Sequence, residues 1–185
     1  MTTETRWAIS GLQPWWWAIV MGYKPIENRR SESSVTHACK RFRGPVLLHA
    51  SAGVGRNSED FDAACDFVGS RVPREAWEAF AKVSVTTKLV PAGHGRKVAR
   101  SSPTDALLRG GIIGQAEVVG IIDPEGQPYG MGSQAAIAAF GDRWDLVRET
   151  WHMPGQWGIL IRNARRLPFV PCKGALGLWR YKEAS

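Results

Sequence analysis

The amino-acid sequence predicts one α+β domain in which five to six short strands, with short flanking helices, form a small mixed β-barrel. The strand candidates are interrupted by helices without the regular strand and helix alternation of a doubly wound sheet. The chain has 185 residues, and its apolar fraction of 44% with nine tryptophans is enough for one packed interior. We therefore interpret residues 1–185 as a single domain.

The first elements follow from residues 6–29. Residues 6–10 alternate and predict an opening strand. Pro14 suits the first turn of a helix and Gly22 its C-terminal cap, so residues 14–21 are expected to be a short helix. Apolar side chains cover nearly its whole circumference, so at least one tryptophan should face something other than the core. Residues 23–29 then predict a second strand.

The middle of the chain alternates between polar stretches and helical patterns. Residues 30–40 are interpreted as a loop, and residues 46–50 as a short buried strand. Helices are predicted over residues 58–70, with acids in the first turn, and from Pro73 onward, with Ala76, Trp77 and Phe80 as the inner face. The polar stretch 82–105 is predicted to be a mobile binding loop, with a brief helix at 103–108.

The last third holds the clearest strand, residues 112–122, which are rich in Ile and Val. A turn region at 123–132 and helices at 133–140 and 142–149 lie within a segment, 123–155, that we interpret as an insertion. Residues 157–162 and 169–180 are expected to supply the final strands.

The charge balance favours a polyanionic partner. The formal net charge is +7, and 17 of the 24 basic residues are Arg, whose planar fork pairs with phosphate and stacks on bases. The alternative is that the basic excess serves solubility alone. Basic residues gather in four clusters, which make one polyanion track if they converge: Arg29 with Arg30, Lys40 and Arg41 with Arg43, Arg96 and Lys97 with Arg100, and Arg162 with Arg165 and Arg166.

Other classes of protein find little support. The three cysteines form no Cys-x-x-Cys pair, so we expect reduced thiols, no metal site and no cofactor. No apolar run approaches the ~20 residues of a membrane span, and the first residues carry no basic stretch before an apolar one. A cytoplasmic protein is therefore expected, with a monomer favoured. Residues 53–56 lack the full glycine pattern of a phosphate-binding loop, and Ser51 lacks the setting of a hydrolase nucleophile.

A series of short motifs runs in order along most of the chain. It comprises Ala-Ile-Ser at 8–10, Gln-Pro-Trp at 13–15, Gly-Tyr-Lys-Pro-Ile-Glu-Asn-Arg at 22–29, Arg-Gly-Pro-Val-Leu-Leu-His-Ala at 43–50, Gly-Ile-Ile-Gly at 111–114, Trp157, and Pro-Cys-Lys-Gly-Ala-Leu-Gly-Leu-Trp at 171–179. This series resembles the ASCH family of the PUA-like superfamily, whose members show Q-P-W/Y, then G-x-K-x-x-E-x-R, then R-G-P-x-L-I-H-A.

The resemblance implies a PUA-like barrel with a cleft between the first helix and the sheet. It also implies that Lys24 and Glu27 lie at that cleft, with Arg29 beside them. Strict alternation puts Lys24 and Glu27 on opposite faces of a strand, so a bulge or turn near Pro25 is needed to join them. Alternatively, Glu27 and Arg29 form an ion pair that only positions the strand.

Two departures from the family pattern concern the site. Family members often carry S-W-x-T-x-Y after the E-N-R, whereas Arg30-Ser31 replaces Ser-Trp here, so one aromatic wall is missing; Trp16 or Trp17 could replace it. Some ASCH proteins are N4-acetylcytidine amidohydrolases that use K-x-x-T and a separate glutamate. Here Glu27 occupies the threonine position, which closes an acyl-enzyme route there but leaves acid–base chemistry open.

The leading functional hypothesis is a binding module for RNA or a modified nucleoside. The base would stack on Trp15 or its neighbour Trp16, and Lys24 and Glu27 would read its polar edge. The phosphate contacts are expected from Arg29, Arg43, Arg162 and Arg165. One alternative is a hydrolase acting on nucleosides or RNA, either amidohydrolase-like or a ribonuclease, that uses Lys24 and Glu27. The second alternative is a protein-interaction module that uses exposed tryptophans.

Overall fold

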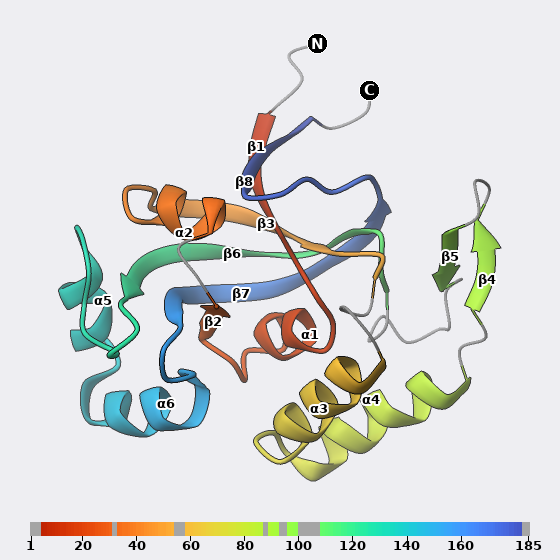
Figure 1. The fold of residues 1–185 in the computed structure, drawn as a ribbon, viewed down its shortest axis with the longest axis horizontal. Coiled ribbons are helices and arrows are strands. Elements are labelled where there is room, and N and C mark those ends of the chain that lie inside the picture. Colours follow the sequence, from red (N-terminus) through yellow and green to blue (C-terminus); the bar gives the residue numbers. More distant parts are fainter. Residues whose placement is uncertain are drawn as a thin grey trace.

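A computed structural model describes residues 5–30, 33–53, 58–86, 89–92, 96–99 and 108–182. It shows an α+β fold built on a six-stranded mixed sheet with strand order β2-β7-β6-β3-β1-β8 (Figure 1). Among the described strands of this sheet, only β1 and β3 pair in parallel. The strands are β1 (Thr5–Gly11), β2 (Ile26–Arg29), β3 (Gly44–Ala50), β6 (Gly111–Ile122), β7 (Trp157–Pro171) and β8 (Leu178–Lys182), with β4 (Leu89–Ala92) and β5 (Arg96–Ala99) in a separate hairpin.

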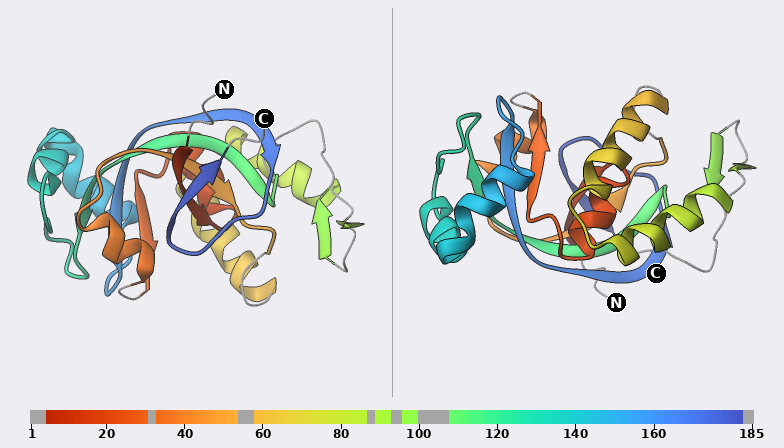
Figure 2. Two further views of the ribbon diagram at one scale, coloured as in Figure 1. Left: turned by 90° about the horizontal axis from the view of Figure 1, so that it is seen from above. Right: turned by 90° about the horizontal axis from the view of Figure 1, so that it is seen from below.

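The helices pack in two groups around this sheet. Helices α3 and α4 pack on the outer side of α1 through Trp17, Val68 and Phe80. Helices α5 and α6 pack against Ile122 and Leu160 of the sheet, and Figure 2 shows them at the opposite end of the molecule from the β4–β5 hairpin. No helix in the described part of the chain has the length and apolar character needed to cross a bilayer. The helices are α1 (Trp15–Val20), α2 (Ser34–Cys39), α3 (Ser58–Gly69), α4 (Arg74–Thr86), α5 (Ser133–Ala138) and α6 (Trp144–Trp151).

The main core lies between the sheet and helices α1 and α2. Trp16 is completely buried there, and its indole Nε1 donates a hydrogen bond of 2.7 Å to the carbonyl of His49. Gly11 allows this ring to approach β1, because a Cβ at that position would lie 2.5 Å from the Trp16 ring. The predicted helix over 14–21 is confirmed, and Gly22 follows it with a φ of +80°, as a helix-terminating glycine does.

The predicted barrel is not closed. Within the described residues, β2 and β8 are the two edges of an open sheet. Strand β8 pairs with β1 only as far as Ile9, and the four-residue β2 reaches the end of β1 through a side chain instead of through its backbone. That side chain is Arg29, whose guanidinium donates to the carbonyl of Ser10 at 3.0 Å. We call the region where β2 approaches β1, defined by Lys24, Glu27, Arg29 and Ser10, the seam.

Several predicted boundaries were wrong. The expected loop at 30–40 contains α2, which begins where the side chain of Ser33 accepts a hydrogen bond from the backbone of Thr36. In the expected loop at 82–105, α4 continues to Thr86 and the β4–β5 hairpin follows. The predicted helix at 103–108 lies outside the described residues except for Leu108, which is not helical. Strand β7 runs unbroken to Pro171, and residues 172–177 form a loop before β8.

Candidate functional site

Three charged side chains meet at the seam. The ammonium of Lys24 lies 3.3 Å from Oε2 of Glu27, and the other oxygen of this carboxylate lies 3.2 Å from the guanidinium of Arg29. Lys24 also donates to the carbonyl of Ile26. The side chains of Lys24 and Glu27 are only 1% and 8% exposed, whereas that of Arg29 is 22% exposed. Arg29 is therefore the accessible end of a buried row of charges.

A turn brings Lys24 and Glu27 together. The backbone amides of Tyr23 and Lys24 both donate to the carbonyl of Ala18 in α1, at 2.9 and 3.1 Å. Strand β2 begins only at Ile26, so Lys24 is not part of the strand and strand alternation does not apply to it. The turn near Pro25 that the sequence required is therefore present, and the two side chains lie on the same side of the chain.

The row of Lys24, Glu27 and Arg29 contains more positive than negative groups. Burial lowers the pKa of the Lys24 ammonium; the Glu27 carboxylate opposes this shift, and Arg29 adds to it. Two cationic groups face one carboxylate, and Nε of Arg29 is buried without a hydrogen-bond partner in the described structure. A buried donor without a partner favours a ligand that brings an acceptor, such as a carbonyl or a phosphate oxygen.

The three tryptophans of α1 point to different surroundings. Trp16 faces the sheet and offers no exposed ring. Trp17 packs on Phe80 of α4, with ring centroids 4.7 Å apart. Trp15 is half-buried, lies 5.5 Å from the ring of Phe67 in α3, and has the Lys24 ammonium 5.4 Å from its ring centroid. Of the two predicted stacking residues, only Trp15 borders the seam with a partly accessible ring.

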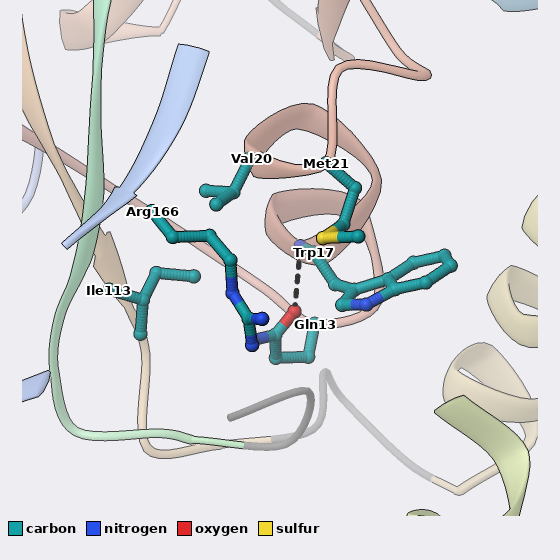
Figure 3. Close-up of a pocket in the computed structure, with 6 residues that line it drawn as sticks. All are labelled: Gln13, Trp17, Val20, Met21, Ile113 and Arg166. Carbon is teal, nitrogen blue, oxygen red and sulfur yellow. Dashed lines mark hydrogen bonds between the residues drawn. The ribbon is translucent and has the colours of Figure 1, made fainter. Parts of the chain in front are cut away.

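A small hollow lies between α1 and the sheet. Figure 3 shows Arg166 reaching from β7 toward Gln13, with Trp17 and Val20 along the helix side. Its volume is about 10 Å³, which is close to the room that one water molecule occupies. Gln13 is buried and donates to the carbonyl of Leu108 at 3.2 Å, while its side-chain oxygen accepts from the Trp17 amide. The hollow is too small for a nucleobase in this conformation.

The predicted residues Arg43, Arg162 and Arg165 are not members of the charged row of the seam. The guanidinium of Arg43 donates to the carbonyls of Cys39 and Phe42 and, at 3.2 Å, to the hydroxyl of Ser133. It therefore links the end of α2 to α5. Arg162 and Arg165 are exposed on β7, paired with Glu117 and Gln115 of β6. The structure thus brings together Trp15, Lys24, Glu27 and Arg29 and separates the other four predicted residues from them.

An aromatic pair beside the seam was not predicted. Tyr129 and Trp157 meet edge to face with centroids 5.0 Å apart, and the Lys40 ammonium lies 4.9 and 4.4 Å from their ring centroids. Trp157 is also the strand partner of Arg29. This pair supplies aromatic surface next to Arg29 from segments that are distant in sequence. Only the motif position of Trp157 pointed to it in the sequence.

The described residues contain no group of three or more His, Cys, Asp or Glu side chains arranged to hold a metal ion. All nine tryptophans are buried or half-buried. Neither the models of known protein families nor the curated proteins yield a match to this chain.

Proposed function

We propose that this chain is an ASCH-type, PUA-like module that binds RNA or a modified nucleoside, with the base held at the seam. The observation that carries the proposal is the buried row of Lys24, Glu27 and Arg29. Removing charges from water costs several kcal/mol per ion before pairing repays it, so apolar side chains would serve the fold as well. Buried, perturbed charges of this kind concentrate at functional sites.

The chemistry of the row favours a polar, uncharged or anionic ligand. Glu27 can accept hydrogen bonds from an amino or imino group of a base, while Arg29 and Lys24 can donate to its carbonyls. The Lys24 ammonium lies over the ring of Trp15, and the accessible part of this half-buried ring offers a stacking surface. Because Arg29 is the most exposed of the three, the ligand enters from its side, next to Trp157.

Isothermal calorimetry with cytidine, N4-acetylcytidine and a short RNA tests this proposal. Glu27→Gln keeps the shape of the side chain and removes its charge. We expect it to weaken binding by about tenfold or more, since a charge-assisted hydrogen bond contributes about 1.5–3 kcal/mol. The double variant Lys24→Ala/Glu27→Ala should lose binding further. Glu149→Gln, at an exposed carboxylate on α6, is the matched control and should bind as the parent does.

Circular dichroism and thermal unfolding establish whether each variant is folded. If Glu27→Gln proves unstable, Arg29→Lys replaces it, since it keeps the charge but loses the planar fork of the more exposed partner. Folded seam variants that bind every ligand as tightly as the parent would rule out this site.

A hydrolase is the second candidate, because the lowered pKa of Lys24 beside a carboxylate suits proton transfer. Incubating the protein with N4-acetylcytidine and with a short RNA, followed by mass spectrometry of the products, separates it from a binding module. The binding proposal predicts intact ligands after prolonged incubation. Product formed by the parent but not by Glu27→Gln would establish the enzyme instead.

A further inference from the structure

The face of the sheet opposite the main core carries α5 and α6 at one end, whereas in the described residues its other end is covered by strands and a loop without a helix. Its buried residues Ala8, Leu47 and Ile112 pack against partly buried Trp179, Tyr181 and others, all from strands or from the loop after β7. We call this the helix-free face. The main core with α1 and α2 lies on the other side of the same strands.

Two arginines belong to the helix-free face. Along β6, Gln115 and Glu117 are half-buried, whereas Ala116 and Val118 between and after them are buried in the main core. Gln115 and Glu117 therefore point away from that core. Strand partners share a face, so Arg165, the partner of Gln115, and Arg162, the partner of Glu117, lie on the helix-free side. Both are exposed.

A third arginine reaches the same place from β1. The guanidinium of Arg6 donates to the side-chain oxygen of Gln115 at 3.0 Å, spanning β3 to do so. This contact holds Arg6 beside the residue that pairs with Arg165. The acid on this face, Glu117, accepts a hydrogen bond of 2.9 Å from Asn163. Among the described residues of this face, three arginines outnumber one glutamate, so its net charge is positive.

Aromatic rings adjoin these arginines. Tyr181 of β8 is the strand partner of Arg6, and its ring centroid lies 6.3 Å from that of Trp179. Both rings are partly exposed. Arginines that pair with phosphates beside rings on which bases stack are the arrangement by which proteins hold single-stranded nucleic acid.

We propose that the helix-free face binds the backbone of a single-stranded RNA, as a second contact surface on the opposite side of the sheet from the seam. The inference rests on the proposed function, because it supplies the phosphate contacts that the seam does not. The seam selects the base, and Arg6, Arg162 and Arg165 add affinity that is independent of sequence. The adjoining aromatic rings favour RNA over an acidic protein segment.

Fluorescence anisotropy with a labelled 12-nucleotide RNA tests the proposal through Arg162→Ala/Arg165→Ala. The slope of log K against log salt is negative, and each lost phosphate contact reduces its magnitude by about 0.7 for single strands, so the double variant should reduce the magnitude by about 1.4. We expect affinity at low salt to fall by about tenfold or more. Arg74→Ala/Arg143→Ala removes the same charge from exposed helical positions and should change affinity by less than about twofold.

Equal losses in the two double variants would overturn the proposal, because net charge alone would then explain the binding. Poly-glutamate of matched length that binds as tightly as the RNA would overturn it in favour of an acidic protein partner. Tyr181→Leu should weaken RNA binding without changing the salt slope, since stacking releases no counterion.

The same variants separate this proposal from that of the seam. Arg162→Ala/Arg165→Ala should bind a free nucleoside as the parent does, because these arginines lie across the sheet from Lys24 and Glu27. RNA binding that depends on these arginines while no nucleoside binds would uphold the helix-free face and reject the seam. Nucleoside binding with unchanged RNA affinity in this double variant would reject the helix-free face alone.

Discussion

The buried side chain of His49 in β3 contacts the loop before β8 and the edge strand β8 itself. It is 3% exposed, its Nε2 lies 3.1 Å from the carbonyl of Cys172, and its ring contacts that of Trp179. Since a carbonyl only accepts, Nε2 carries the proton and Nδ1 does not. Nδ1 is buried without a partner in the described structure, and burial lowers the pKa of the ring.

We predict that His49 makes stability depend on pH below about 6.5, its ordinary pKa. As the pH falls through this value, the unfolded chain takes up the proton first, because the folded state holds the ring neutral. The free energy of unfolding should therefore decrease as the pH is lowered from about 7 toward 5. Urea denaturation at a series of pH values measures this slope.

His49→Gln keeps a donor for the Cys172 carbonyl and should flatten the slope. His37→Gln, at an exposed histidine of α2, should leave the slope as it is in the parent. An unchanged slope in His49→Gln would show that other groups set the pH dependence.

Arg43 acts at the scale of elements, since it joins the end of α2 to the start of α5. Its guanidinium has acceptors on Cys39, Phe42 and Ser133, and the hydroxyl of Ser133 in turn donates to the carbonyl of Tyr129. We predict that Arg43→Ala lowers the free energy of unfolding by about 1–3 kcal/mol, because it leaves buried acceptors without a partner. Hydrogen exchange should speed up in α2 and α5.

Arg41→Ala is the matched control, because Arg41 is an exposed neighbour. Nucleoside binding at the seam should persist in both variants, since the hydrogen bonds of Arg43 go to Cys39, Phe42 and Ser133 and not to the charged row. Loss of nucleoside binding in folded Arg43→Ala, with Arg41→Ala unaffected, would place Arg43 in the site after all.

Sequence patterns within a segment predicted the helices and strands whose ends those patterns determine. Pro14 and Gly22 gave both ends of α1, and the run of Ile and Val gave β6. Helix α2 was overlooked although Ser33 and Thr36 form a recognisable start of a helix. Strand β7 continues through Asn163 although this residue has a φ of +52°. The neighbouring residues did not predict that a strand would continue through such a conformation.

The candidate site was predictable only in part, for the same reason. Lys24 and Glu27 are three residues apart, so a local turn was enough to predict that their side chains meet. The contact of Arg29 with Ser10 and the aromatic pair of Tyr129 and Trp157 join segments that are distant in sequence. Such contacts follow from the curvature of the whole sheet, which local patterns do not encode.

At the scale of the whole molecule, the open sheet separates two kinds of surface. At the seam, β2 contacts β1 through the Arg29 side chain and not through backbone hydrogen bonds. In a closed barrel, backbone pairing between strands would occupy the place that polar side chains take here. The other side of the sheet carries the exposed arginines Arg162 and Arg165 of β7. The net charge of +7 favours a polyanionic partner, and we propose that selection of the ligand depends on the seam.

A nucleoside titration followed by NMR of isotope-labelled protein tests the central claim most directly. We predict that saturating N4-acetylcytidine or a related nucleoside shifts the backbone amides of residues 24–29, the Trp15 indole and the Arg29 side chain, with no comparable change on the helix-free face. Shifts confined to the open depression of about 370 Å³ beside α5 and α6, or no saturable shift with any nucleoside, would contradict the account.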